Sequence, residues 1–146
     1  MTFENLRFVV PEGEMGLNFT GPEMKASNVL FDGSQANGTV LVDVQQVEWD
    51  RVDMDGLVGK PTTRDPSAVL IRNFDHILWT NSTISSLING IVVEADRPTF
   101  SKVNFTDLVF QDCSKSNGGG GAVDIRLGNA ALSLSNVRFE NNLVDL

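Results

Sequence analysis

The sequence predicts an all-β solenoid, in which short parallel strands coil around a single core. A short phrase recurs along the 146 residues, and the apolar runs between its copies are brief and β-branched. No segment keeps the 3.6-residue period of a helix. Because one such unit cannot bury its own apolar side chains, the units are expected to stack on one another.

The recurring phrase places apolar residues in three columns. Aligned on its last large residue, it ends at Phe8, Phe31, Met54, Trp79, Phe110 and Phe139. Two residues earlier stand Leu6, Val29, Val52, Ile77, Leu108 and Val137, and five residues earlier stand Phe3, Ala26, Trp49, Phe74, Phe105 and Leu134. Side chains of a strand alternate between its faces, so the first two columns share a face and the third does not. The chain must therefore bend inside each phrase.

The residue three before each final position is the expected bend residue. Asn, Asp and His are the side chains enriched at positive φ. We therefore predict a structural ladder at a left-handed bend, made of Asn5, Asn28, His76, Asp107 and Asn136. Arg51 occupies the same position and is the exception.

A further short apolar run follows each phrase and completes the unit. These runs, at 17–19, 40–44, 69–71, 91–93 and 123–125, are predicted strands. Strand, bend, strand and loop then recur about every 26 residues, which predicts about six coils in one domain over 1–146. Neither end carries a recognisable cap, so we expect a fragment of a longer repeat protein, or end-to-end pairing.

These features resemble the right-handed parallel β-helix family, the pectate-lyase-like fold with an asparagine ladder at a tight turn. The last third is similar to the repeat of polymorphic outer membrane proteins, with GGAV at 120–123 and FENN at 139–142 in place of its GGA[IV] and FxxN elements. The resemblance implies a right-handed, single-stranded helix in an extracellular or surface protein. It also implies adhesion, display or glycan contact, with flanking coils of the same protein as neighbours.

The composition of the chain limits the classes of binding partner. The net charge is −8, the pI is near 4.4 and the basic residues are scattered, which argues against nucleic acid and anionic membrane surfaces. No apolar stretch is long enough to span a bilayer, and the first residues lack the features of a signal peptide. The single cysteine, Cys113, excludes an internal disulfide framework and is expected to be a small buried residue.

Candidate binding residues lie in the loop that follows each phrase, at 9–16, 32–39, 55–68, 80–90 and 111–122. Stacked loops on a rigid scaffold form a common kind of binding face. Within them we single out Lys60, Arg64 and Asp65 as binding residues. Four Asn-x-Ser/Thr sequons, at Asn18, Asn37, Asn81 and Asn104, are candidate glycosylation sites.

An enzyme is the alternative interpretation. Asp32, Asp53 and Asp55 are the nearest approach to the calcium cluster of a polysaccharide lyase, although solvated turn aspartates are the simpler and favoured explanation. His76 lacks an evident orienting carboxylate and fits a bend residue better than a general base. No catalytic set, cofactor motif or phosphate loop is present, with calcium the one cofactor left open. We therefore expect a non-enzymatic adhesion, display or glycan-contact segment; a carbohydrate-active enzyme and a structural spacer remain the alternatives.

Overall fold

The protein is all-β in the residues that its computed structural model describes, which are 1–10, 16–33, 39–59, 67–95, 99–115 and 121–144. Its strands are β1 (Thr2–Val9), β2 (Leu17–Asp32), β3 (Val40–Asp55), β4 (Val69–Arg72), β5 (His76–Ser85), β6 (Ile91–Ala95), β7 (Ser101–Gln111), β8 (Ser114–Lys115), β9 (Val123–Leu127), β10 (Ala130–Ser135), β11 (Arg138–Glu140) and β12 (Leu143–Val144). The predicted fold class is thereby confirmed.

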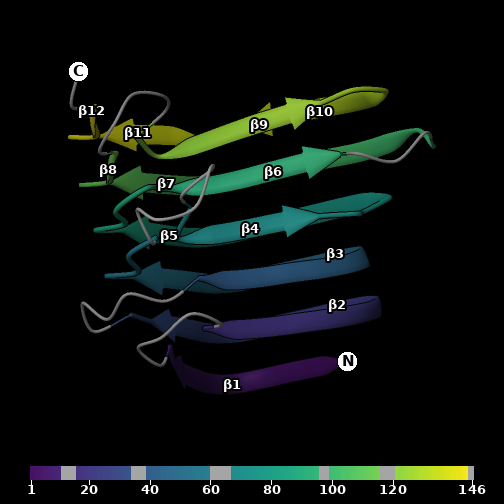
Figure 1. Ribbon diagram of the computed structural model, residues 1–146, viewed down its shortest axis with the longest axis horizontal. Coiled ribbons are helices and arrows are strands. Elements are labelled where there is room, and N and C mark those ends of the chain that lie inside the picture. Colours follow the sequence, from purple (N-terminus) through teal and green to yellow (C-terminus); the bar gives the residue numbers. More distant parts are fainter. Residues whose placement is uncertain (11–15, 34–38, 60–66, 96–98, 116–120, 145–146) are drawn as a thin grey trace.

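All strand pairs are parallel, and they stack as the layers of a solenoid (Figure 1). Ten strands form one sheet, whose main path runs β10-β7-β5-β3-β4-β6-β9, with β1 and β2 stacked beyond β3 and β11 paired to β7. β8 and β12 form a second, two-stranded sheet. β1 and β10 therefore lie at opposite ends of the stack. Right-handed coiling and the number of six coils stay predictions.

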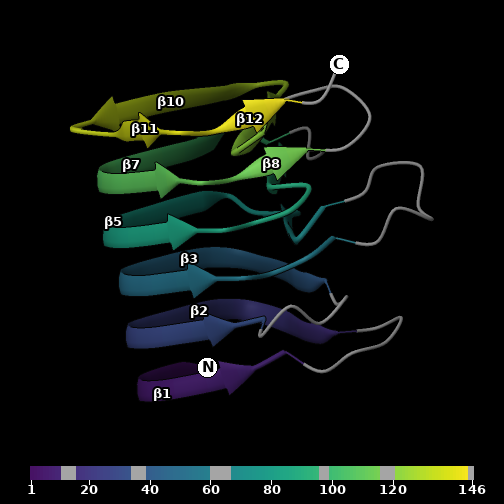
Figure 2. The ribbon, with the colours of Figure 1, turned by 90° about the vertical axis from the view of Figure 1, so that its left-hand side faces the viewer.

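The pairing register divides the stacked strands into three faces (Figure 2). Face A holds 17–21, 40–44, 69–72, 91–95 and 123–127. Face B holds 2–4, 23–27, 46–50, 76–80, 102–106 and 131–135. Face C holds 6–9, 29–32, 52–55, 82–85, 108–111 and 138–140. Long strands such as β2 and β3 turn from face to face without ending.

A left-handed residue makes the bend between faces B and C in every layer. Asn5, Asn28, Arg51, Asn81, Asp107 and Asn136 all have φ between 50° and 55°. Arg51 thus adopts the bend that its neighbours in the column adopt, although arginine is not a favoured residue there. Four of the five predicted ladder residues lie at this bend, and His76 does not.

The prediction for His76 is wrong because the phrase of the fourth layer ends at Ile84, five residues after Trp79. Trp79 pairs with Trp49 and Phe105, whereas Ile84 takes the final position beside Met54 and Phe110. The bend residue of this layer is Asn81, and His76 lies within β5 opposite Gln46 and Lys102.

Ser82 explains why the sequence pattern misled. It stands in the aliphatic column with Leu108 and is 3% exposed. Its hydroxyl donates to the Thr80 carbonyl at 2.8 Å and accepts from the Val52 amide at 2.9 Å. A buried hydroxyl with both bonds made is tolerated among apolar neighbours. Because Ser82 is polar, the copy of the phrase that ends at Ile84 does not show the aliphatic residue expected two positions before its end.

A second bend column, which the sequence analysis did not identify, follows face C. Gly56, Ser86, Asp112 and Asn141 have φ of 64°, 56°, 52° and 52°. They follow residues paired in register on face C, so this corner repeats in four layers, whereas Val10 and Gly33, at the same place in the first two layers, do not have positive φ. The predicted loop at 80–90 is accordingly wrong, since 80–85 belong to β5.

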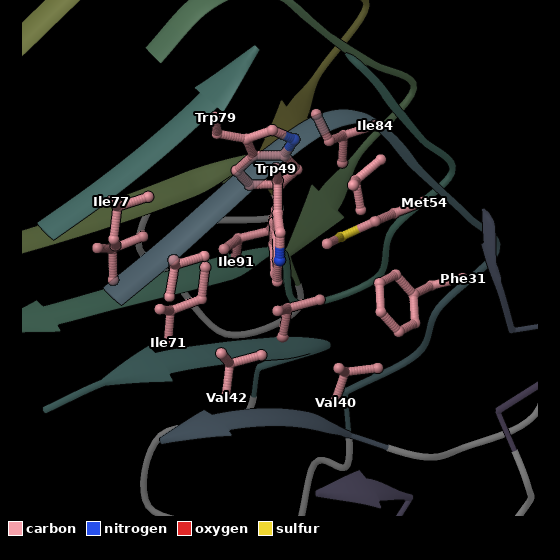
Figure 3. Packing of buried hydrophobic residues seen from close by; sticks show 14 of the residues in the cluster. Phe31, Val40, Val42, Trp49, Met54, Ile71, Ile77, Trp79, Ile84 and Ile91 are labelled. Carbon is pink, nitrogen blue, oxygen red and sulfur yellow. The ribbon is translucent and has the colours of Figure 1, made fainter. Parts of the chain in front are cut away.

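Aromatic and aliphatic side chains fill the interior between the faces (Figure 3). Trp49 and Trp79 meet edge to face, with ring centroids 5.0 Å apart, and Phe105 continues the column 5.7 Å from Trp79. Aromatic pairs favour this geometry. Cys113 is fully buried, as expected, and burial raises the pKa of its thiol. The core therefore runs along the stack.

Candidate functional site

A depression of about 310 Å³ lies on the outside of face B, over β1, β2, β3 and β5. It is bordered by Thr2, Phe3, Glu4, Lys25, Ala26, Ser27, Glu48, Trp49, Asp50, Leu78 and Thr80. Ala26 and Trp49 are buried in the core, so the outward-facing residues supply its walls. We call these outward-facing residues the face B groove.

Two rows of side chains form the walls of the face B groove. One row, read across the layers, is Thr2, Lys25, Glu48 and Leu78; the other is Glu4, Ser27, Asp50 and Thr80. Residues two apart on a strand point the same way, so both rows leave the same side of the sheet. The groove consequently runs across the strands, along the axis of the stack.

Lys25 forms two ion pairs in and beside the first row. Its ammonium lies 3.1 Å from the carboxylate of Glu48 in the next layer and 3.2 Å from that of Glu23 on its own strand. The hydrogen bond to Glu48, supported by Glu23, raises the pKa of Lys25 above its ordinary value. All three side chains are solvated, so these ion pairs orient the groups and add little stability.

Asp50 anchors the second row. Its carboxylate accepts hydrogen bonds from the Asn81 amide at 2.7 Å, the Thr80 hydroxyl at 3.0 Å and the Arg51 guanidinium at 3.2 Å. The Asn81 bond above all lowers the pKa of Asp50. Asp50 remains an anion at neutral pH and is held in place by the next layer.

Asp50 also replaces a missing rung of the bend ladder. The Asn28 amide donates to the Asn5 side-chain oxygen, and the Asn136 amide to Asp107, each at 2.6 Å. Arg51 has no side-chain oxygen, so Asn81 reaches the preceding Asp50 instead. Every layer has the left-handed bend residue, whereas the amide–oxygen bonds join only separate pairs of adjacent layers.

Carboxylates, hydroxyls and one ammonium in such a groove are suited to binding a polyhydroxylated ligand. Carboxylates accept hydrogen bonds from hydroxyls, and Ser27 and Thr80 can both donate and accept. Leu78, 37% exposed, offers one apolar contact. Nothing in the groove provides the paired nucleophile and base of an acyl-transfer site.

The predicted calcium residues lie on face C, away from the groove. The register sets Asp32 beside Asp55, as the repeat predicted. Arg7 forms an ion pair with Asp32, Asp55 accepts from the Ser85 hydroxyl at 2.7 Å, and Asp53 accepts from the Thr83 amide at 2.7 Å. Over the described ranges, no group of three or more His, Cys, Asp or Glu side chains is placed to hold a metal ion.

Three of the four sequon asparagines, Asn18, Asn81 and Asn104, and the lone histidine lie in regular strands. The Asn104 amide meets His76 Nε2 at 3.2 Å, and the Thr20 hydroxyl donates to the Asn18 side-chain oxygen at 3.3 Å. Asn81 is engaged with Asp50. Glycosylation of these residues stays a prediction.

The loop residues Lys60, Arg64 and Asp65 and the sequon at Asn37 lie outside the described residues. The groove itself was missed by the sequence analysis. Its signal was present in the alternating polar residues of 23–27 and 46–50, but only the register aligns them across layers.

Comparisons with known proteins identify no relative of this chain: no family model matches, and no curated protein or solved structure matches significantly. In the part of the chain that the structure describes, no helix is long and apolar enough to cross a membrane.

Proposed function

We propose that this chain is a non-enzymatic segment of an extracellular or surface protein, and that its face B groove contacts glycans. The observation that carries the proposal is the groove, whose two rows present hydroxyls and carboxylates along the axis of a stiff stack. The resemblance to right-handed β-helix proteins and to polymorphic outer membrane protein repeats agrees with this role.

The charge of the groove favours a neutral glycan. Glu4, Glu48 and Asp50 contribute three carboxylates against the single ammonium of Lys25. A uronic acid or a sulfated sugar would meet like charges, which oppose binding when charges are a few ångströms apart. A neutral hexose chain can donate its hydroxyls to the carboxylates at no such cost.

Titration of the protein with neutral and acidic oligosaccharides, followed by amide chemical shifts, tests the proposal. We expect shifts in residues of β1, β2 and β3 with neutral chains, and loss of binding in Glu48→Ala. Lys102→Ala is the matched control, because Lys102 is exposed on face B but does not border the groove. Binding that is unaffected by Glu48→Ala, or that maps to another face, contradicts the groove; no binding at all favours a structural spacer.

A calcium-assisted carbohydrate-active site is the second candidate, favoured by the register that sets Asp32 beside Asp55. Two carboxylates in adjacent layers are hard oxygen ligands of the kind that calcium binds. Millimolar calcium should then raise the melting temperature, and Asp55→Asn should abolish the rise. An unchanged melting temperature argues against this candidate without affecting the glycan groove.

A further inference from the structure

The C-terminal end of the stack exposes apolar side chains that belong to core columns. Leu134 of β10 and Phe139 of β11 are 51% and 53% exposed, and Leu132 lies beside them. Phe139 stacks on Phe110 with ring centroids 5.1 Å apart and planes 10° apart, so one side of its ring is covered by the preceding layer. Its other side faces the open end of the column.

The N-terminal end repeats this arrangement in the opposite sense. Leu6 is 45% exposed, and Phe8 stacks on Phe31 with centroids 5.2 Å apart and planes 13° apart. Phe8 and Phe139 thus stand at the two ends of one core column, which holds Met54 and Ile84 in its middle layers. The two ends also present the backbone edges of β1 and of β10 and β11, which are templates for a further parallel strand.

The register determines which residues would meet if the C-terminal layer of one copy continued into the N-terminal layer of another. Following the pairs through the stack, Leu134 falls opposite Phe3, Val137 opposite Leu6, and Phe139 opposite Phe8. All three pairs are apolar. We propose that the chain assembles head to tail with a second copy of itself through these end faces.

Polar groups at the junction match as well as apolar ones. Asn136 falls opposite Asn5, which repeats the Asn28–Asn5 rung with the same pair of residue types. In both rungs inside the chain, the asparagine of the later layer donates its amide to the side-chain oxygen of the layer before it. At the junction, Asn5 of the second copy is in the later layer and donates in the same direction to the side-chain oxygen of Asn136. Amide pairing favours this register over neighbouring ones.

Charge supports the same register. Within the chain, the Arg7 guanidinium binds the carboxylate of Asp32 in the next layer. Glu140 of the last layer occupies the same column as Asp32. In the junction Glu140 lies between Arg138 of its own copy, 3.8 Å away, and Arg7 of the second copy. One carboxylate between two guanidinium groups offsets the repulsion of Arg7 and Arg138.

The junction closes faces B and C but not face A. β1 has no face A segment, so β9 of one copy and residues 17–21 of the next are separated by one empty strand position. An interface over two of three faces is expected to be weaker than the contacts between internal layers. Since the two end faces differ, the contact is heterologous and can continue into longer rods.

Sedimentation velocity and light scattering of the whole chain, from about 5 to 500 μM, test the assembly. We expect the average mass to rise above the 15.9 kDa of a monomer as concentration increases. Leu6→Lys and Leu134→Lys each block one end, so each should remain monomeric alone. An equimolar mixture should form one-to-one dimers and nothing longer, because each variant keeps one intact end.

Ser133→Lys is the control, since Ser133 points outward from β10 and should leave assembly unchanged. A wild-type chain that stays monomeric at the highest concentration overturns the proposal and leaves the end faces to flanking coils of a longer protein. Dimers formed by either blocked variant alone also overturn it, because they require head-to-head or tail-to-tail contact. Circular dichroism checks that each variant is folded.

A disulfide trap tests the register without depending on the charged variants. Glu4→Cys combined with Ser135→Cys sets two cysteines directly opposite, at the 4.7–4.9 Å strand spacing that a disulfide accepts. Glu4→Cys with Ser133→Cys is shifted by two residues and should link poorly. A disulfide-linked series on a non-reducing gel supports the register; its absence, or equal linking of both pairs, overturns it.

Discussion

The middle of the stack and its C-terminal layer carry the same columns of residues but differ in burial. Trp79 of β5 and Phe105 of β7 are almost completely buried, whereas Leu134, which continues their column, is half exposed. Phe110 and Phe139 differ in the same way. In a solenoid a side chain is buried by the layers on both sides of it, so position along the stack decides how much an apolar residue stabilises the fold.

The largest effect is expected from truncating the middle of the core. Trp79→Ala should lower the free energy of unfolding by about 3–5 kcal/mol, because it leaves a cavity beside Trp49 and Phe105. Phe139→Ala at the end should cost about 1 kcal/mol, since only one side of its ring is covered. Urea unfolding at low protein concentration measures both. Equal losses would show that the last layer is covered in solution.

The next largest effect concerns the bend. Asn81→Leu should cost about 2–3 kcal/mol, because leucine is strained at positive φ and the bond to Asp50 is lost. His76→Leu is the comparison, and should cost less than about 1 kcal/mol because His76 is an ordinary strand residue. A larger loss in His76→Leu than in Asn81→Leu would restore the alignment that the sequence suggested.

Arg51→Asn should stabilise the protein by about 0.5–1 kcal/mol. Asparagine tolerates positive φ better than arginine does, and could extend the amide ladder. Thermal unfolding beside Arg51→Lys, which keeps the charge and the unfavourable φ, separates the two causes. Destabilisation would mean that the bond from Arg51 to Asp50 contributes more than the bend.

The smallest effect is a pH dependence at the same corner. Because the pKa of Asp50 is lowered in the folded protein, its contribution is present above the unfolded value of about 3.9 and is lost as the pH falls through the folded pKa. The melting temperature should therefore fall less between pH 5 and pH 3 in Asp50→Asn than in the wild type. Identical pH profiles would show that the Asn81 bond does not depend on the charge of Asp50.

The solenoid, its parallel strands and most of the residues at the first bend could be predicted from the sequence. Asn5, Asn28, Asp107 and Asn136 could be identified because a left-handed residue restricts side-chain type strongly and locally. The apolar columns were equally visible, since each strand must turn the same face inward in every layer. These are constraints that act within a few residues.

The fourth layer and the face B groove could not be predicted, because they depend on contacts between strands. Ser82 is acceptable in an aliphatic column because Thr80 and Val52 satisfy its hydroxyl. The second bend, at Gly56, Ser86, Asp112 and Asn141, was missed although it stands two residues after the final position of the phrase in each of these layers and three of its four residues are types that favour positive φ. Asp50 and Thr80 become neighbours in the groove only through a register set some 30 residues apart. The fourth layer and the groove both depend on hydrogen bonds between adjacent layers, whose residues lie some 30 positions apart in the chain and leave no periodic signal in the sequence.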